Sequence, residues 1–226
     1  MSGPPAPSVF VFCDVDETLI RGKSMVDFLE FYLAGRYGAQ GGRRAARIQG
    51  LLGSMAATGV PRAQANRRYY RAWAGEPADA VDEAGRRWWA ERSADADFYL
   101  ATTRAELRGH RTAGAVLVLV SGSLPALVGP IAADVGAAVA LCARPLVRGG
   151  RLTGALDGEP MIGEAKGRAV RDLLRRHPSV APADCYAYGD HESDLPMLAE
   201  VGHPVVVGAD PRLLGRLPRA RALVAV

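Results

Sequence analysis

Residues 8–18 read SVFVFCDVDET, a short apolar run that ends abruptly in acidic residues. Ser8–Cys13 is rich in Val and Phe and continuously apolar, which is typical of a strand buried on both faces of a parallel sheet. Asp14 and Asp16 follow it directly. In open parallel sheets, ligands bind beyond the carboxyl ends of the strands. This stretch therefore predicts the first strand of an α/β core and one part of a functional site.

Four further apolar runs of strand length follow, and helical patterns separate them. Leu124–Val135 and Glu164–Arg176 carry apolar residues at helical spacing. Strands that alternate with helices form βαβ units, so the sequence predicts a doubly wound α/β fold whose parallel sheet is covered on both faces. The four runs are Ala115–Val120, Ala137–Cys142, Cys185–Tyr188 and Pro204–Val207.

About a hundred residues separate the first two predicted strands, whereas an ordinary crossover helix needs only ~10–15. Helical patterns broken by Gly and Pro fill this interval. We therefore predict an inserted α-helical cap over residues 22–100 and a core made of residues 1–21 and 101–226. In the core, Pro145–Leu156 has two glycines between β-like segments and predicts a hairpin. The predicted cap helices are Met25–Tyr37, Arg43–Met55, Arg62–Trp73 and Ala78–Arg92.

The composition is that of an ordinary globular chain, because 49% of its 226 residues are hydrophobic and 23% are charged. The formal charge of +4 is too small to indicate a nucleic-acid partner. No apolar stretch approaches the ~18 residues of a membrane span, and the first residues lack a basic signal region. Cys13, Cys142 and Cys185 lack metal-ligand spacing. We expect a soluble, cytoplasmic protein with reduced thiols and no stable membrane insertion.

Polar and charged residues follow three of the predicted strands. The second strand ends in Ser121 and Gly122, and Cys185–Tyr188 leads into a loop with Asp190 and Asp194. Lys166 begins the helix before that loop. Carboxylates, a hydroxyl and an ammonium at one edge of a sheet suit a phosphoryl group and a hard divalent cation.

Taken in order, four motifs resemble those of the haloacid dehalogenase-like phosphatases: DVDET (14–18), VSGS (120–123), GEAKGRA (163–169) and GDHESDLPML (189–198). The resemblance spans the whole core. The helical insert after the first motif resembles the cap of the phosphoserine-phosphatase-like branch. The resemblance implies a Rossmann-like core and Mg²⁺-dependent hydrolysis of a small phosphate ester through an aspartyl-phosphate.

The resemblance also implies a role for each matching residue. Asp14 would attack phosphorus, and Asp16 would protonate the leaving oxygen and then activate water. The phosphoryl oxygens would be held by Ser121, backbone N–H groups near Gly122 and Lys166.

The same resemblance implies a magnesium site. Asp14, the backbone carbonyl of Asp16 and Asp190 would bind Mg²⁺, with Asp194 as a further ligand or as a residue that orients the ligands. Carboxylates at strand ends also serve as helix caps, and DxDxT alone occurs by chance. The assignment therefore depends on the four motifs occurring together and in order.

Four residues within the motifs have interpretations that need no direct part in the reaction chemistry. Ser123 could cap the helix that begins at Leu124, and Thr18 could stabilise the turn after the first strand. His191 is expected in a solvated loop. Lys166 is expected to be exposed at the edge of the sheet, so that it contributes to ligand binding more than to the core.

Positive charge is concentrated in residues 22–75, which contain nine Lys or Arg residues but only two acidic residues. The excess indicates either a second anionic group on the substrate or an Arg-rich solvated surface, and both interpretations stay open. If the substrate carries a second anionic group, our candidates for binding it are Arg67, Arg68 and Arg71. Phosphoserine is possible but not favoured, because Arg21 and Lys23 occupy the segment where the resemblance would place an acid for the serine amine.

Five aromatic residues of the insert could line a substrate pocket or form the core of the cap, and their helical spacing favours the core. The aromatic residues are Tyr69, Tyr70, Trp73, Trp88 and Trp89.

Two other functions share part of the motif pattern. A receiver-like phospho-accepting domain lacks the long insert and the second acid. A non-catalytic phosphate-binding protein would not need the intact acids.

Overall fold

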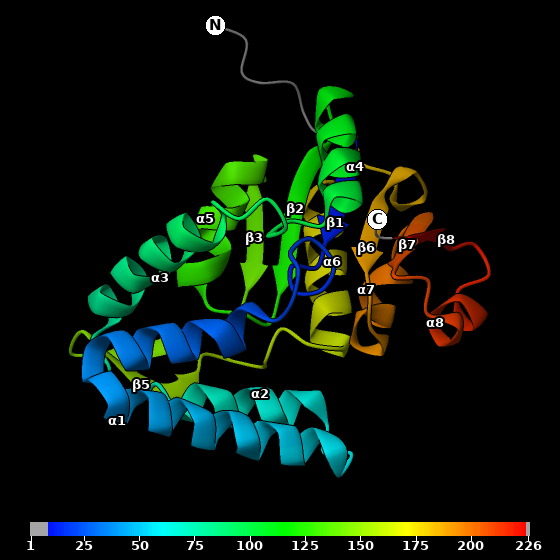
Figure 1. The fold of residues 1–226 in the computed structure, drawn as a ribbon. Helices are drawn as coiled ribbons and strands as arrows, with labels where there is room; N and C mark the ends of the chain where they lie inside the picture. The colour runs from blue at the N-terminus through cyan, green and yellow to red at the C-terminus, as the bar shows by residue number, and fades with distance from the viewer. Residues whose placement is uncertain (1–8, 225–226) are drawn as a thin grey trace, which may run out of the picture.

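A six-stranded parallel sheet with helices on both faces forms the centre of the molecule (Figure 1). The computed structural model describes residues 9–224, so Ser8, the start of the first predicted strand, lies outside the described residues. The strands of this sheet are β1 (Phe10–Cys13), β2 (Val116–Ser121), β3 (Val139–Cys142), β6 (Tyr186–Gly189), β7 (His203–Val207) and β8 (Arg221–Leu223). Their spatial order is β3-β2-β1-β6-β7-β8, and all neighbours are parallel. The predicted doubly wound α/β fold is confirmed.

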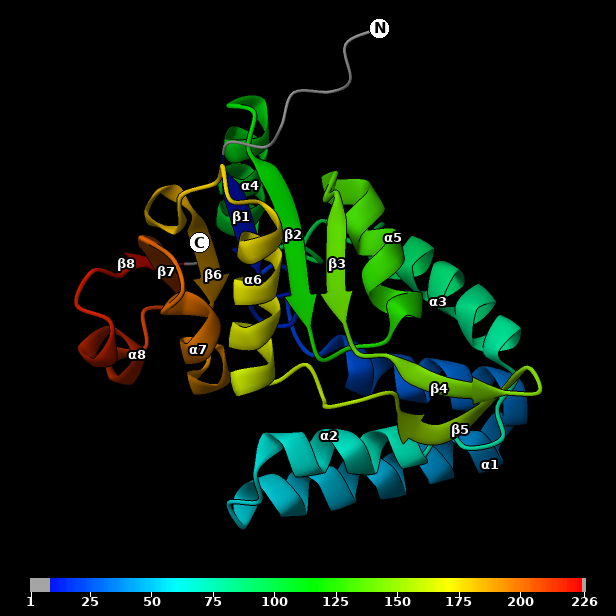
Figure 2. The same ribbon diagram turned by 180° about the vertical axis from the view of Figure 1, so that it is seen from behind.

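Different helices cover the two faces of the sheet, which Figure 2 shows from behind. These helices are α4 (Ala101–Thr112), α5 (Pro125–Val135), α6 (Glu164–Arg176) and α7 (Leu195–Leu198). Val11 and Cys13 of β1 belong to the apolar cluster that includes α4 and α5. Phe10 and Phe12 point to the other face and pack with α6 and α7. Because both faces are buried, β1 is apolar at every position rather than at alternate ones.

The last strand of the sheet is absent from the sequence-based prediction. β8 has only three residues, Arg221–Leu223, and it pairs with the edge of β7. Its first two residues are exposed, so no apolar run marks it. It follows α8 (Pro211–Arg216), whose first turn is capped by Asp210 through a hydrogen bond from Arg212 N (2.7 Å).

Three helices fill the insert between β1 and β2: α1 (Ser24–Ala57), α2 (Arg62–Arg71) and α3 (Ala78–Arg92). α1 reverses direction at Gly38, which has φ 57° and ψ −142°. Its two halves lie side by side, as Figure 1 shows in dark and light blue, and Gln49 Nε2 donates to the Val26 carbonyl across them (3.2 Å). A Cβ on Gly41 would lie 1.8 Å from the Leu33 carbonyl oxygen, so this reversal requires glycine. The predicted glycine-separated pair of helices is confirmed.

The buried carboxylate of Glu76 joins both halves of α1 to the segment before α3. Tyr32 and Tyr37 each donate a hydroxyl hydrogen bond to it at 2.9 Å. Arg44, beyond the reversal, donates to its other oxygen at 3.2 Å. A buried carboxylate is tolerated when it is paired and hydrogen-bonded, and here those partners also hold the helical hairpin together.

The predicted hairpin is present as β4 (Pro145–Arg148) and β5 (Arg151–Leu156). Gly149 and Gly150 have φ of 55° and 71°, as a two-residue turn of this hand requires. The hairpin packs against the inserted helices instead of joining the main sheet. Gly75 N donates to the Leu152 carbonyl (2.8 Å), and Leu152 N donates to the Glu76 carbonyl (2.9 Å).

The helix α3 lies against α5, a helix of the core. At the crossing, Gly85 approaches so closely that a Cβ there would lie 2.3 Å from the Ala126 carbonyl oxygen. The division into a cap at 22–100 and a core on either side stays a prediction, and both this crossing and the hairpin contacts span its boundary. Four of the five aromatic residues of the insert lie in the apolar core, as the helical spacing indicates, and Trp89 is half-buried.

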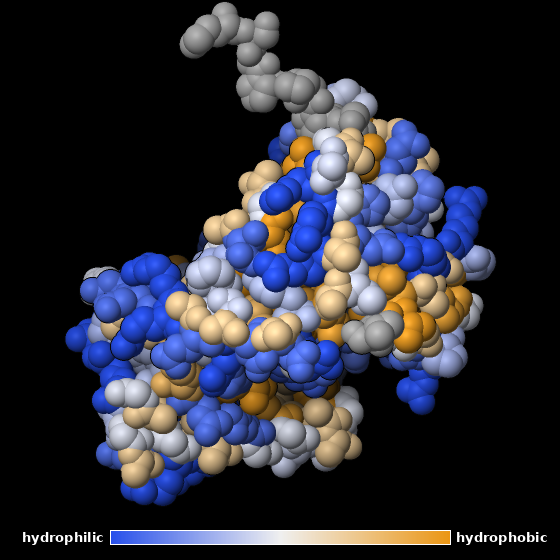
Figure 3. All heavy atoms as spheres, turned by 45° about the horizontal axis from the view of Figure 1, so that its top comes forward, coloured by the Kyte–Doolittle hydropathy of each residue, from blue (hydrophilic) through white to orange (hydrophobic). Residues whose placement is uncertain are grey.

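Polar side chains cover most of the face seen in Figure 3, where hydrophobic residues form small separate groups. Among residues 9–224, no helix has both the length and the apolar composition needed to cross a membrane. α1 has 34 residues, but Arg43, Arg44 and Arg47 interrupt its apolar positions.

The crossing of α3 and α5 predicts a stability difference between two glycine substitutions. Gly85→Ala should lower the free energy of unfolding by about 1–3 kcal/mol, because the added methyl group meets backbone and the helices must separate. Gly109→Ala, in the exposed part of α4 with nothing within 4 Å of its Cβ, should raise it by up to about 1 kcal/mol. Urea unfolding of both variants measures this, and equal stabilities would contradict the close crossing.

Candidate active site

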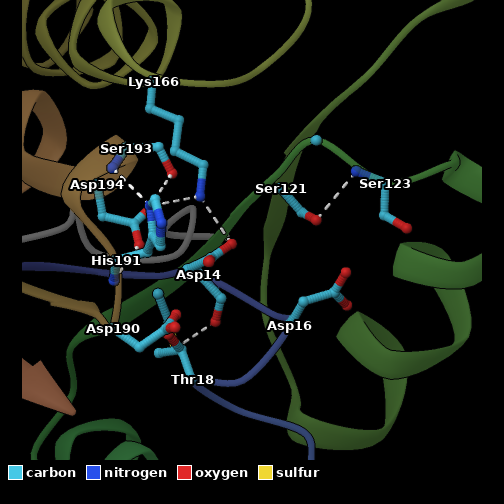
Figure 4. Close-up of polar contacts among 12 residues, drawn as sticks. Asp14, Asp16, Thr18, Ser121, Ser123, Lys166, Asp190, His191, Ser193 and Asp194 are labelled. Atoms are coloured by element: carbon cyan, nitrogen blue, oxygen red, sulfur yellow. Dashed lines mark hydrogen bonds and ion pairs between the residues drawn. The ribbon is translucent and has the colours of Figure 1, made fainter. Parts of the chain in front are cut away.

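Asp14 directly follows the central strand and continues its pairing with β6, because its N–H donates to the Tyr188 carbonyl (3.0 Å). The ends of β2 and β6 flank it and carry Ser121 and Asp190. The carboxyl ends of neighbouring parallel strands meet at one edge of the sheet. The structure therefore brings together the three motifs that the sequence places after strands (Figure 4).

Lys166 reaches this edge from the first turn of α6. Its Nζ lies 2.7 Å from a carboxylate oxygen of Asp14 and 2.7 Å from one of Asp194. The residue is only 3% exposed, so the expectation of an exposed lysine is wrong. The reason is the packing of α6: a Cβ on Gly167 would lie 2.9 Å from the Pro196 carbonyl oxygen, and this close contact buries the turn. Burial opposes the charged form, yet Asp14 and Asp194 raise the pKa of Lys166 above its ordinary value.

Three carboxylates gather around this lysine. Asp14, Asp190 and Asp194 each offer one oxygen within 4.8 Å of the others. Burial raises the pKa of Asp14, although Lys166 opposes the shift, and burial raises the pKa of Asp190 to about 6. One ammonium does not balance three carboxylates in a buried site, so the cluster needs another cation if all three are to stay ionised. Hard oxygen donors at this spacing fit Mg²⁺.

Asp194 and Asp190 are each held by further hydrogen bonds. The second oxygen of Asp194 accepts from His191 N (3.1 Å), while Asp190 Oδ1 accepts from the Thr18 hydroxyl (2.7 Å). Thr18 thus contacts the acid cluster and does more than stabilise a turn. His191 is exposed, as expected for a loop residue, and its ring accepts from Ser193 N (3.0 Å) at the start of the short 3₁₀ helix Glu192–Asp194.

The carboxyl group of Asp16 points away from Asp190 (Figure 4). Its Oδ1 accepts from the backbone N–H of Ser24, the first residue of α1 (3.1 Å). Burial raises the pKa of Asp16, with the hydrogen bonds from Ser24 opposing the shift. A carboxyl group with a raised pKa keeps its proton to higher pH, which is the property that a general acid requires.

The loop after β2 carries Ser121 and contacts the start of α1. Ser121 Oγ accepts from the backbone N–H of Ser123 (3.1 Å). Ser123 does not cap α5, because that helix begins after Leu124 without a side-chain cap. Its hydroxyl instead lies 2.9 Å from the Ser24 hydroxyl, which joins this loop to α1.

A small cavity of about 60 Å³ lies at the centre of these groups. Larger clefts lie between α1 and α3 and between α3 and α5, but the acid cluster lines neither of them. Five of the seven predicted site residues line the small cavity, and Asp190 and Asp194 lie beside it in the acid cluster. The five are Asp14, Asp16, Ser121, Gly122 and Lys166.

Six lining residues were not among the predicted site residues: Met25, Arg62, Asn66, Ser123, Ile162 and Ser193. Arg62 and Asn66 are one helical turn apart on α2, and Arg62 Nη1 lies 3.5 Å from Ser193 Oγ. The sequence-based candidates Arg67, Arg68 and Arg71 are exposed and do not line the cavity. The inward face of α2 is marked by residues at helical spacing: Asn66 and the buried Tyr69, Tyr70 and Trp73. Arg62 lies one turn before Asn66 on the same face, so this spacing could have identified it.

Solved structures of other proteins share this fold. A Bordetella pertussis protein of unknown function superposes with a TM-score of 0.81 at 23% identity, covering 97% of this chain and 99% of that one. A structure described as a phospho-aspartyl intermediate analogue of phosphoserine phosphatase superposes with a TM-score of 0.69 at 21% identity, covering 97% and 94%. At these identities the likeness shows a shared fold.

Curated relatives include two proteins of Mycobacterium tuberculosis. A probable phosphatase is 39% identical over 104 residues, which are 46% of this chain and 36% of that protein. Phosphoserine phosphatase SerB1 is 31% identical over 206 residues, which are 89% of this chain and 65% of that protein. The chain therefore spans between about one third and two thirds of the length of these relatives.

The family comparison covers the strands and loops that build the site. Residues 11–199 match the model of the haloacid dehalogenase-like hydrolases, and this range extends from β1 past the loop that carries Asp190 and Asp194. With most of its length inside that match, the chain belongs to the haloacid dehalogenase-like hydrolases.

Proposed function

We propose that this protein hydrolyses small phosphate monoesters and that Asp14 is the nucleophile. The observation that carries the proposal is the position of Asp14 at the end of the central strand, 2.7 Å from the buried Lys166 and in one small cavity with Asp16. A nucleophilic carboxylate, a fixed cation and a second acid are the groups that phosphoryl transfer to an aspartate requires.

The reaction proceeds in two steps. A carboxylate oxygen of Asp14 attacks phosphorus, the bond to the ester oxygen breaks, and protonated Asp16 gives its proton to the leaving oxygen. Asp16, now ionised, takes a proton from water, and the hydroxide attacks the phosphorus of the aspartyl-phosphate. Phosphate leaves and Asp14 is regenerated. Lys166 and the Ser121 hydroxyl hold phosphoryl oxygens throughout.

Asp14, Asp190 and the backbone carbonyl of Asp16 would hold Mg²⁺, which when bound supplies positive charge to the carboxylates and phosphoryl oxygens. For Asp194 we propose a different task. Both of its oxygens are already engaged, one by Lys166 and one by His191 N. Asp194 would therefore position the lysine and its own loop.

We propose a substrate that carries a second anionic group. The cavity is only about 60 Å³, so it suits a group as small as a phosphoryl group. Among the described residues that line it, Arg62 is the one cation besides Lys166, and it comes from α2 rather than from the core. The lining acids are Asp14 and Asp16, both assigned to the reaction, so a substrate amine such as that of phosphoserine finds no further carboxylate.

Removing the nucleophile tests the reaction itself. Asp14→Asn should abolish Mg²⁺-supported hydrolysis of p-nitrophenyl phosphate, because an amide neither attacks phosphorus nor supplies an anionic ligand. Chelation of Mg²⁺ by EDTA should have the same effect on the unaltered protein, and added Mg²⁺ should restore its activity. Substantial turnover by Asp14→Asn would overturn the mechanism, and a receiver-like domain would show stoichiometric labelling without turnover.

Asp16→Asn separates proton transfer from metal binding. Turnover should fall by about 10²–10⁴, the usual contribution of a general acid-base, while the Mg²⁺ concentration for half-maximal activity stays the same. The raised pKa of Asp16 also sets a pH limit: for an alkyl phosphate, kcat should fall as pH rises through that pKa, because the acid form donates the proton. A raised Mg²⁺ requirement in Asp16→Asn would show that its side chain binds the metal.

Arg62→Gln tests the second anionic group. We expect it to raise KM for a phosphate ester that also bears a carboxylate by about tenfold or more relative to p-nitrophenyl phosphate, since a hydrogen-bonded charge pair contributes about 1.5–3 kcal/mol. Joint replacement of Arg67, Arg68 and Arg71 by Gln is the matched control and should leave the ratio unchanged. If the control shifts the ratio and Arg62→Gln does not, α2 presents its outer face to the substrate.

A further inference from the structure

Two buried side chains of α2 converge on one backbone carbonyl beside the cavity. Asn66 Nδ2 donates to the Gly122 carbonyl at 3.1 Å, and the Tyr70 hydroxyl donates to the same oxygen at 2.9 Å. Asn66 is 6% exposed and Tyr70 is 1% exposed. A carbonyl oxygen has two lone pairs, so these two donors satisfy it fully. The inserted helix thus determines the orientation of a peptide group in the loop after β2.

That peptide group connects α2 to the hydroxyl that faces the phosphoryl group. The Gly122 carbonyl and the Ser123 N–H belong to one planar unit, so fixing the carbonyl also fixes the direction of the N–H. The N–H donates to Ser121 Oγ at 3.1 Å. A hydroxyl that accepts this bond keeps its single proton free to donate elsewhere. Ser121 lines the cavity, where a phosphoryl oxygen is the acceptor that the proposed reaction supplies.

The loop has little room for another arrangement. A Cβ on Gly122 would lie 3.1 Å from Ile162 Cγ1 and 3.3 Å from Asn66 Nδ2, so side chains enclose the peptide closely. Without its donors, the carbonyl would be a half-buried acceptor without a partner, which is unfavourable. Rotation of the peptide to recover a partner would turn the Ser123 N–H away from Ser121.

We propose that Tyr70 and Asn66 are positioning residues: through the Gly122–Ser123 peptide they orient the Ser121 hydroxyl to donate to the phosphoryl group. The inference rests on the proposed phosphatase function. It assigns to α2 a part in binding the phosphoryl group itself, in addition to the contact that Arg62 offers to the rest of the substrate. The donor arrangement is complete only while α2 lies against the loop.

Tyr70→Phe and Tyr69→Phe form a matched pair. Each variant removes one hydroxyl group, and the two residues are adjacent on α2 and 1% exposed. They differ in the partner that is lost, because the Tyr69 hydroxyl donates to the Met25 carbonyl (3.0 Å) inside the insert. Tyr70→Phe should lower kcat for p-nitrophenyl phosphate by about tenfold, equivalent to about 1.4 kcal/mol, and weaken binding of inorganic phosphate. Tyr69→Phe should leave both within about twofold of wild type, at a comparable melting temperature.

A double-mutant cycle with Ser121→Ala distinguishes positioning from packing. If Tyr70 acts through the Ser121 hydroxyl, Tyr70→Phe has no further effect on kcat or on phosphate binding once that hydroxyl is gone. Additive effects would show that Tyr70 only packs α2 against the loop and would overturn the inference. Asn66→Ala should behave in the same way in the cycle.

Phosphate binding, measured by titration calorimetry, separates this inference from the proposed function. A wild-type protein that binds phosphate without turnover would reject the phosphatase proposal, while the binding cycle would still decide the role of Tyr70. A wild-type protein that does not bind phosphate at all would overturn the inference itself.

Discussion

The ion pair between Lys166 and Asp14 is the interaction on which the rest of the site depends. Both side chains are buried, and a buried charge that loses its partner costs about 3–5 kcal/mol, so each requires the other. The central position of β1 makes this burial unavoidable, because strands flank Asp14 on both sides. Gly167 allows α6 to approach Pro196 closely enough to place the ammonium there. Because one lysine does not balance three acids, the same cluster needs a further cation if all three are to stay ionised.

The insert completes this core site through a few polar contacts. Ser24 at the start of α1 donates to Asp16, the residue that we assign to proton transfer. Asn66 and Tyr70 of α2 hold the Gly122 carbonyl, and Arg62 lies at the cavity. The residues to which we assign the reaction thus lie outside the insert, while the insert contacts Asp16 and the Gly122 carbonyl beside the cavity. This division explains how one core could serve different substrates, because side chains on the insert can change without moving the acids.

Much of the fold was predictable because its signals are local. The SVFVFC run and the later apolar runs have the length and composition of buried strands. Gly38 marks the α1 reversal, and the paired glycines Gly149 and Gly150 mark the hairpin turn. β8 was not predictable, because a three-residue edge strand with exposed side chains has no apolar pattern. The meeting of Asp14, Ser121 and Asp190 was predictable as well, since parallel strands end at one edge.

The sequence by itself determined the order of strands and helices along the chain, the acids that follow the strands, and the family resemblance that they carry. Only the tertiary structure decided which neighbours those groups meet. Lys166 is buried rather than exposed, Thr18 holds Asp190, and Arg62 rather than Arg67 reaches the cavity. The hairpin pairs with the insert although it follows β3. These outcomes depend on how each helix is rotated and how closely it packs against distant segments. Such contacts join residues that lie far apart along the chain, and that separation carries no information about how close they are in space.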